Sequence, residues 1–109
     1  MNQILCIGSV NLDHTYQVPH IVRPGETIAC AGYRRHWGGK GLNQALALAR
    51  AGADVHLAAR VSAADLPALA ALGAENGLDT ALTEGCASPT GHAVIQVDGS
   101  GQNCIVIYA

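Results

Sequence analysis

The chain has 109 residues, of which half are hydrophobic and 4% are aromatic, with no phenylalanine. This length suits one domain, and its core must come from alanine, leucine, isoleucine and valine. Six basic and eight acidic side chains give a formal charge of −2, which argues against a nucleic-acid partner bound through its phosphates. The N-terminus lacks the basic region of a signal peptide, and no stretch reaches the ~18 apolar residues of a membrane span. We therefore expect a cytoplasmic protein with no membrane partner.

The first predicted element is a strand over residues 4–10. Its apolar run is typical of a strand that is buried on both faces of a parallel sheet. Asn11 and Asp13 follow, and we expect them at the carboxyl end of the strand, where open α/β sheets bind ligands. A carboxylate and an amide together suit the neighbouring hydroxyls of a polyol. The alternative is an Asx turn that leaves the strand.

Residues 15–36 contain two short β-like pieces, "TYQV" and "TIACAGYRRH". The dipeptide Pro24-Gly25 between them is a strong turn signal. Both pieces are too short and too polar for a core sheet. They predict an exposed sheet or flap.

A glycine-rich loop precedes the first predicted helix, with Gly38, Gly39 and Gly41 around Lys40. The loop is not a P-loop, because no Ser or Thr follows the lysine, and it lies too far from the first strand for a dinucleotide-binding fingerprint. Three glycines at a helix start still let a ligand approach free backbone N–H groups. The alternative is a tight turn with a solvated lysine.

The helix after this loop is predicted from an apolar stripe at helical period, formed by Leu42, Ala45, Leu46 and Ala49. Gly52 follows as a left-handed C′ residue. A strand over residues 55–59 then completes a βαβ unit with a long insertion.

A second helix starts near Asp65, because Pro67 is tolerated only in the first turn. Leu66, Leu69 and Leu72 line one side of it. Ser62 is a candidate cap, and Gly77 closes the helix.

The final segment predicts a hairpin, in which "GHAVIQV" and "NCIVIYA" flank the turn "DGSGQ". Ala93, Ile95 and Val97 alternate onto one face. Since only two core strands are evident, we interpret the chain as the N-terminal piece of a larger protein.

The cysteines and histidines show no metal-ligand spacing. We expect buried free thiols rather than disulfides or ligands at Cys6, Cys30, Cys86 and Cys104. Scattered structural or surface histidines are expected at His14, His20, His36, His56 and His92. No metal site is predicted.

Four segments together resemble a known family: "GSVNLD", "PGET", "WGGKGLNQALALARAGADV" and "TGHAVIQVDGSGQNCIV". They are similar to the N-terminal part of the ribokinase-like PfkB family of carbohydrate kinases. The resemblance implies an α/β fold, a mostly parallel sheet flanked by helices with a small β-sheet lid. Residues 1–109 would form the N-terminal part of that domain, with 15–36 and 91–108 contributing to the lid.

The resemblance also implies an activity, the ATP-dependent phosphorylation of the hydroxymethyl group of a small sugar. It implies ATP, Mg²⁺ and a monovalent cation as cofactors, and a homodimer formed through the lid. The implied substrate-binding residues are Asn11, Asp13, Gly39, Lys40, Gly41, Asn43, Ala93, Ile95 and Ile107. The catalytic base and the nucleotide pocket are expected beyond Ala109, so this chain alone would be inactive.

One stretch departs from the family pattern. The family's G-x-D-x-x-G segment reads "VSAADLPALA" here, shortened and without the glycines. Two alternatives stay open. A nucleoside kinase would be favoured by a purine-stacking aromatic in the lid, for which Tyr16, Tyr33 and Trp37 are candidates. A non-catalytic sugar-binding or oligomerising fragment belongs to another class.

Overall fold

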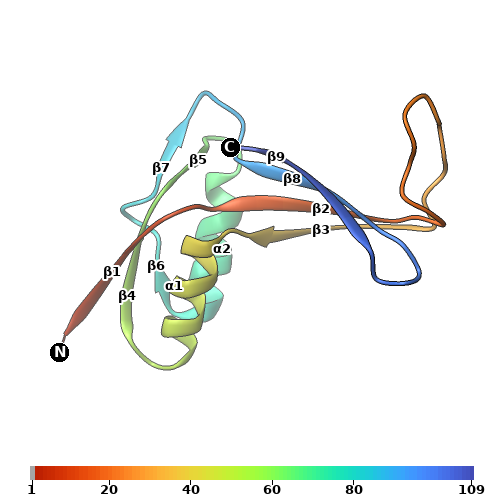
Figure 1. Ribbon diagram of the computed structural model, residues 1–109. Helices are drawn as coiled ribbons and strands as arrows, with labels where there is room; N and C mark the ends of the chain where they lie inside the picture. Colours follow the sequence, from red (N-terminus) through yellow and green to blue (C-terminus); the bar gives the residue numbers. More distant parts are fainter. Residues whose placement is uncertain (1) are drawn as a thin grey trace.

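The structure is a computed structural model that describes residues 2–109. A three-stranded parallel sheet, with the two helices packed on it, forms one part of the molecule, which we call the base. Its strand order is β1 (Gln3–Ile7), β4 (Asp54–Ala58) and β6 (Leu78–Asp79). Helix α1 (Lys40–Arg50) packs against all three strands, α2 (Leu66–Asn76) packs against β6, and the two helices pack against each other (Figure 1). The parallel pairing of β1 with β4 confirms the predicted βαβ unit with its long insertion.

The core lies between this sheet and the two helices. Its fully buried side chains are Leu42, Val55, Leu57, Val61 and Leu69. The predicted apolar stripe of α1 is confirmed, because all four of its residues are buried. The chain leaves α1 through a glycine with a φ of +94° at position 52, as predicted from its place after the last turn.

The limits of α2 also follow the sequence. The helix begins after Asp65, carries Pro67 in its first turn, and ends at Gly77 with a φ of +72°. The expectation that Ser62 caps this helix is wrong. Ser62 lies in a short strand, β5 (Arg60–Ser62), which pairs in parallel with β7 (Glu84–Cys86). Its hydroxyl accepts only a long 3.4 Å hydrogen bond from the N–H of Ala64.

A second, four-stranded sheet projects from the base as an arm (Figure 1). Its order is β3 (Gly32–Gly38), β2 (Asn11–Gln17), β8 (His92–Val97) and β9 (Asn103–Tyr108). Strand β2 runs antiparallel to β3 and parallel to β8. Strands β8 and β9 form the predicted hairpin.

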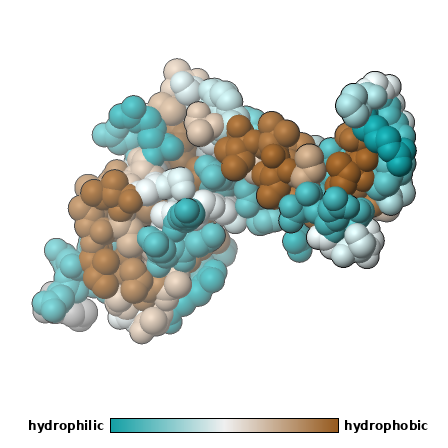
Figure 2. All heavy atoms as spheres, in the orientation of Figure 1, coloured by the Kyte–Doolittle hydropathy of each residue, from teal (hydrophilic) through white to brown (hydrophobic). Residues whose placement is uncertain are grey.

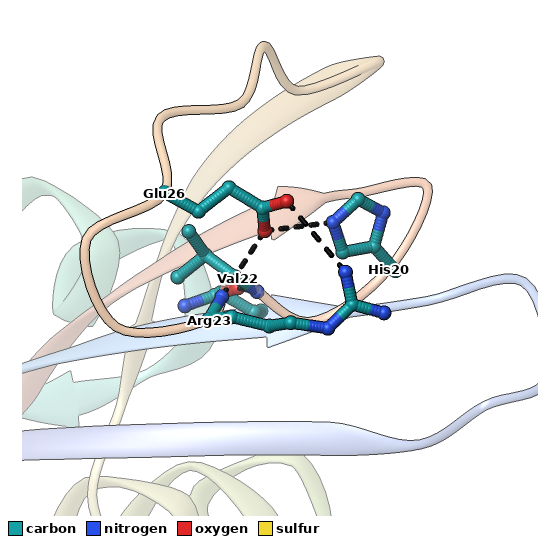
Figure 3. Close-up of polar contacts among 5 residues, drawn as sticks. His20, Val22, Arg23 and Glu26 are labelled. Carbon is teal, nitrogen blue, oxygen red and sulfur yellow. Dashed lines mark hydrogen bonds and ion pairs between the residues drawn. The ribbon is translucent and has the colours of Figure 1, made fainter.

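The second β-like piece predicted within residues 15–36 is shorter than expected. Residues 27–31 are irregular, and β3 begins only at Gly32. The predicted turn is present: Gly25 has a φ of +78°, and the N–H of Glu26 donates to the carbonyl of Arg23 at 3.0 Å. Figure 3 shows how Glu26 closes this loop. Its Oε1 accepts from the N–H of Arg23 and lies 2.8 Å from Nε2 of His20.

The first strand differs most from its prediction. We expected a strand over residues 4–10 buried on both faces, but β1 ends at Ile7 and its residues alternate in exposure. Leu5 is 54% exposed and Ile7 is 78% exposed, because the helices cover only one face of the sheet. Figure 2 shows this uncovered hydrophobic surface over β1 and β4, and a second one over β8 and β9.

All four cysteines are free. The prediction of free thiols is therefore confirmed, but the expected burial is wrong: Cys30 and Cys104 are exposed, and Cys6 and Cys86 are only half-buried. Cys104 lies on β9, at the edge of the arm, where no other element covers it. Within residues 2–109, neither helix is both long and apolar enough to cross a membrane.

Candidate functional site

An open cleft of about 500 Å³ lies where the arm meets the N-terminus of α1. Its lining residues are Ser9, Asn11, Asp13, Gly39, Lys40, Asn43, Ala93, Ile95, Ile105 and Ile107. Every substrate-binding residue implied by the sequence therefore lines one cleft, with the exception of Gly41. Segments that are distant in sequence supply this lining: β2, the start of α1, and the β8–β9 hairpin.

The polar wall of the cleft comes from β2. Asn11 and Asp13 are two residues apart in this strand, so their side chains point to the same face. They were expected at the carboxyl end of the first strand, but Asn11 opens β2 instead. Two glycines make room for them. A Cβ atom at Gly38 would collide with the Asp13 carboxylate, and one at Gly91 would lie 2.7 Å from the Asn11 side-chain oxygen.

The start of α1 is held against the linker between β1 and β2. Gly39 has a φ of +98°, and a Cβ there would lie 2.6 Å from the carbonyl oxygen of Ser9. The Ser9 hydroxyl accepts from the N–H of Lys40 at 3.1 Å, and its carbonyl accepts from the N–H of Leu42 at 3.1 Å. These contacts place Lys40 and Asn43 at the cleft. Ser9 was missed because a single serine after a strand carries no distinctive pattern.

Gly41 has a packing role that the sequence did not indicate. It is buried in α1 and is not among the lining residues of the cleft. A Cβ at this position would lie 2.5 Å from the carbonyl carbon of Gly8 and 2.8 Å from the backbone nitrogen of Ser9. The missing side chain therefore lets the helix pack closely on the β1–β2 linker. The ligand contact expected at Gly41 stays a prediction.

The polar groups of the cleft are free to bind. Within residues 2–109, the side chains of Asn11, Lys40 and Asn43 make no hydrogen bond to the protein. The same is true of Asp13, whose ionisable neighbour is His36, with its Nε2 3.5 Å from the Asp13 Oδ2. A row of available donors and acceptors in a concave surface indicates a polar ligand.

Beside Asp13, the same face of the arm is aliphatic. Asp13 pairs with Ala93 of β8, and Ala93 and Ile95 in turn pair with Ile107 and Ile105 of β9, so all of them share the face that looks onto the cleft. Ile105 was missed, although its two-residue spacing from Ile107 would have placed it on this face. Polar groups beside an aliphatic patch fit a small molecule with many hydroxyls and exposed C–H groups.

The candidate purine-stacking aromatics lie elsewhere. Tyr16 alternates with Asp13 and Thr15 along β2, so it occupies the opposite face, where its ring is 5.0 Å from that of Tyr33. Trp37 packs against the core of the base. None of the three lines the cleft. In the part of the chain that the structure describes, no group of three or more His, Cys, Asp or Glu side chains is arranged to hold a metal ion.

Comparison with known proteins gives consistent results. A family model described as pfkB family carbohydrate kinase matches residues 1–109. Ribokinase from Haemophilus influenzae is 38% identical over 103 residues, which is 93% of this chain and 34% of the relative. A crystal structure of ribokinase from Cryptococcus neoformans in complex with ADP has a TM-score of 0.84 and 40% identity, covering 99% of this chain and 35% of that one.

A structure of Arabidopsis thaliana ribokinase complexed with ribose and ATP has a TM-score of 0.84 and 30% identity, covering 97% of this chain and 35% of that one. The present chain thus spans about a third of the length of the relatives that it matches. These matches confirm the ribokinase-like fold class predicted from the sequence.

Proposed function

The chain belongs to the pfkB family of carbohydrate kinases, and we propose that it supplies the sugar-binding part of an enzyme that phosphorylates the hydroxymethyl group of a small sugar with ATP. The observation that carries this proposal is the mixed lining of the cleft. Strand β2 and the start of α1 present hydrogen-bonding side chains that no protein group satisfies, and β8 and β9 present an aliphatic patch beside them. A sugar has hydroxyls for the polar groups and C–H groups for the aliphatic patch.

Each part of the cleft has a role in this proposal. The Asp13 carboxylate accepts hydrogen bonds from two sugar hydroxyls, and the Asn11 amide both donates and accepts. Lys40 and Asn43 bind further hydroxyls at the start of α1. Gly39 keeps the backbone accessible there. Residues 15–36 and 91–108, which include β8, β9 and parts of β2 and β3, act as the lid over the sugar, with Ala93, Ile95 and Ile107 against its C–H groups.

Phosphoryl transfer depends mainly on positioning and on electrostatic stabilisation of the transferred group. In our proposal this chain positions the acceptor hydroxymethyl group. The catalytic base and the sites for ATP, Mg²⁺ and a monovalent cation lie outside these residues. ATP supplies the phosphoryl group that the sugar hydroxyl accepts.

Ribose is the first substrate to test, because a relative of 30% identity is described with ribose and ATP. We also propose a cytoplasmic homodimer that forms through the arm, without nucleic-acid or membrane partners. Exposed apolar side chains on the arm support the dimer: Val94 is 40% exposed and Val106 is 66% exposed. They lie on the face of the arm opposite the cleft, because they alternate with Ala93 and Ile107.

The test removes the Asp13 carboxylate from the complete protein that contains this chain. Asp13→Ala should weaken ribose binding by about 2–4 kcal/mol, taking about 1.5–3 kcal/mol for each hydrogen bond to a charged group with incomplete additivity. Asp13→Asn should cost less, because the amide keeps one acceptor. Glu75→Ala removes a carboxylate from an exposed position on α2, away from the cleft, and serves as the matched control.

Calorimetry measures the affinity, and ATP-dependent formation of a sugar phosphate measures the reaction. Unchanged ribose affinity in Asp13→Ala would refute the sugar site. Ribose binding without phosphorylation by the complete protein would favour a non-catalytic sugar-binding module. Inosine binding that is much tighter than ribose binding would favour a nucleoside kinase, although no described aromatic side chain lines the cleft.

A further inference from the structure

We propose that His36 is a positioning residue for sugar binding, and that its protonated form holds and partly neutralises the Asp13 carboxylate when a sugar occupies the cleft. This inference rests on the proposed sugar site. The two residues are directly paired across β2 and β3, so they share one face of the arm. The His36 Nε2 atom lies 3.5 Å from the Asp13 Oδ2 atom.

The Asp13 carboxylate is asymmetrically placed. Oδ2 packs against the bare Cα of Gly38 and faces the imidazole of His36. No described residue donates a hydrogen bond to either oxygen, so both keep free lone pairs. His36 is not among the lining residues of the cleft. It therefore acts on a sugar through Asp13 rather than by direct contact.

The charged groups around this pair are few. On the same face of the arm, β3 carries Arg34 and the start of α1 contributes Lys40, while β8 and β9 present aliphatic groups. Arginine and lysine keep their charge throughout the neutral range, whereas an imidazole takes up its proton between pH 8 and pH 5. The other histidines lie on the opposite face of the arm, in the loop after β2, or in the base sheet. Within the described chain, His36 is thus the one histidine that faces the Asp13 carboxylate.

A bound sugar removes water from the Asp13 carboxylate. Taking a charge out of water is costly unless the charge is paired. The imidazolium of His36 offsets part of this cost and restricts the rotation of the carboxylate, whereas the neutral imidazole does neither. Ribose binding should therefore be tighter at low pH than at high pH. Both side chains are partly exposed, at 42% for His36 and 22% for Asp13, so the effect is that of a screened ion pair, about two- to fivefold in affinity.

The experiment measures ribose affinity of the complete protein by calorimetry at about pH 6 and about pH 8. The wild type should bind about two- to fivefold more tightly at the lower pH. His36→Gln cannot be charged and should bind with the weaker affinity at both pH values. His36→Lys is charged at both and should keep the tighter affinity. His14→Gln is the matched control, because His14 is next to Asp13 in sequence but points to the opposite face, where it contacts Tyr33.

The outcomes separate this inference from the proposed function. Equal wild-type affinity at the two pH values would overturn it, as would a pH dependence that persists in His36→Gln or disappears in His14→Gln. Loss of ribose binding in His36→Lys at both pH values would also overturn it, because charge would then not be the cause. The proposed sugar site itself fails only if Asp13→Ala binds ribose as tightly as the wild type. Melting temperatures show that each variant is folded, which the position of His36 on the edge strand β3 favours.

Discussion

The substitution Gly41→Ala tests the close packing between α1 and the β1–β2 linker. In an unobstructed helix this change would stabilise the protein by about 1 kcal/mol, because alanine is the better helix former. Here the new Cβ would lie 2.5 Å from the carbonyl carbon of Gly8, and ordinary contacts begin at 3.4 Å. Helix and linker must therefore separate by about 0.9 Å. Backbone atoms cannot yield by a change of rotamer, so the core beneath them must shift.

Overpacking of this kind costs about 1–3 kcal/mol, and the clash involves three backbone atoms rather than one flexible side chain. The clash with three backbone atoms favours the upper part of this range, about 2–3 kcal/mol. After subtracting the helix-propensity gain of about 1 kcal/mol, we expect a net loss of about 1–2 kcal/mol in the free energy of unfolding. For a domain of this size that loss lowers the melting temperature by about 5–15 °C. Thermal denaturation followed by circular dichroism measures it. Gly99→Ala is the control, because no atom lies within 4 Å of its added Cβ and its φ is ordinary.

An unchanged or higher melting temperature for Gly41→Ala would refute the packing argument. It would return Gly41 to the role first expected from the sequence, a position kept bare for a ligand. In that case ribose affinity should fall while stability does not.

The remaining predictions concern catalysis, pH and assembly. A protein of residues 1–109 alone should show no ATP-dependent phosphorylation of ribose, and measurable turnover would contradict the proposed division of the active site. Acid should destabilise the chain, because hydrogen bonds lower the pKa of three carboxyls below their ordinary values. The pKa of Glu26 is lowered by His20 and the Arg23 N–H, and that of Asp79 by the Ala81 N–H and His56. The pKa of Asp98 is lowered by Ser100. Each of these carboxylates stabilises the folded state, because its pKa is lower there than in the unfolded chain. The stabilisation is complete when the pH is above the ordinary pKa, 4.5 for Glu26 and 3.8 for the two Asp residues, and it is lost as the pH falls through the lowered pKa of the folded state. Melting temperatures should therefore be level at neutral pH and fall below about pH 4, less steeply in Asp98→Asn, and a level profile down to pH 3 would contradict this. Light scattering at ~100 µM, a concentration that reveals weak association, should show a dimer, and a sharp monomer would count against pairing through the arm.

The elements that could be predicted from the sequence have both a periodic pattern of apolar residues and a residue that ends the element. Helix α1 combines an apolar stripe with Gly52, and α2 lies between Pro67 and Gly77. The β8–β9 hairpin has alternating strands around a glycine-rich turn. In each case the signal is local, so a single sequence is sufficient to read it.

The boundary between β1 and β2 could not be predicted in the same way. Apolar residues continue from Ile4 to Val10, interrupted only by Gly8 and Ser9. The chain nevertheless passes there from the base sheet into the arm. That passage depends on the close approach of α1 to Gly8, a tertiary contact that no local pattern reports. The exposure of Leu5 and Ile7 was unpredictable for a related reason, because it depends on which face of the sheet the helices cover.

The substrate-binding residues were found through the family resemblance, and the structure explains why they lie together. Reading the residues one by one could not separate two kinds of glycine in the loop, because both kinds require the absence of a Cβ. Gly39 lines the cleft and has a positive φ, and Gly38 leaves space for the Asp13 carboxylate. Gly41 instead allows the close packing of α1. His36 was missed because histidines were considered only for metal-ligand spacing along the chain. Its significance comes from pairing across two strands.

The shape of the cleft thus depends first on a close contact between two backbone segments, the start of α1 and the β1–β2 linker. Gly8 and Gly41 bring α1 against the linker, and that contact sets the distance between Lys40 on the helix and Asp13 on β2. A cleft made in this way transmits a packing change directly to the ligand groups, because the same linker starts β2 and caps α1. Substitutions at Gly8 or Gly41 should therefore affect stability and ribose affinity together. Substitutions at Asp13, whose carboxylate accepts no hydrogen bond from the described protein, should affect affinity more than stability.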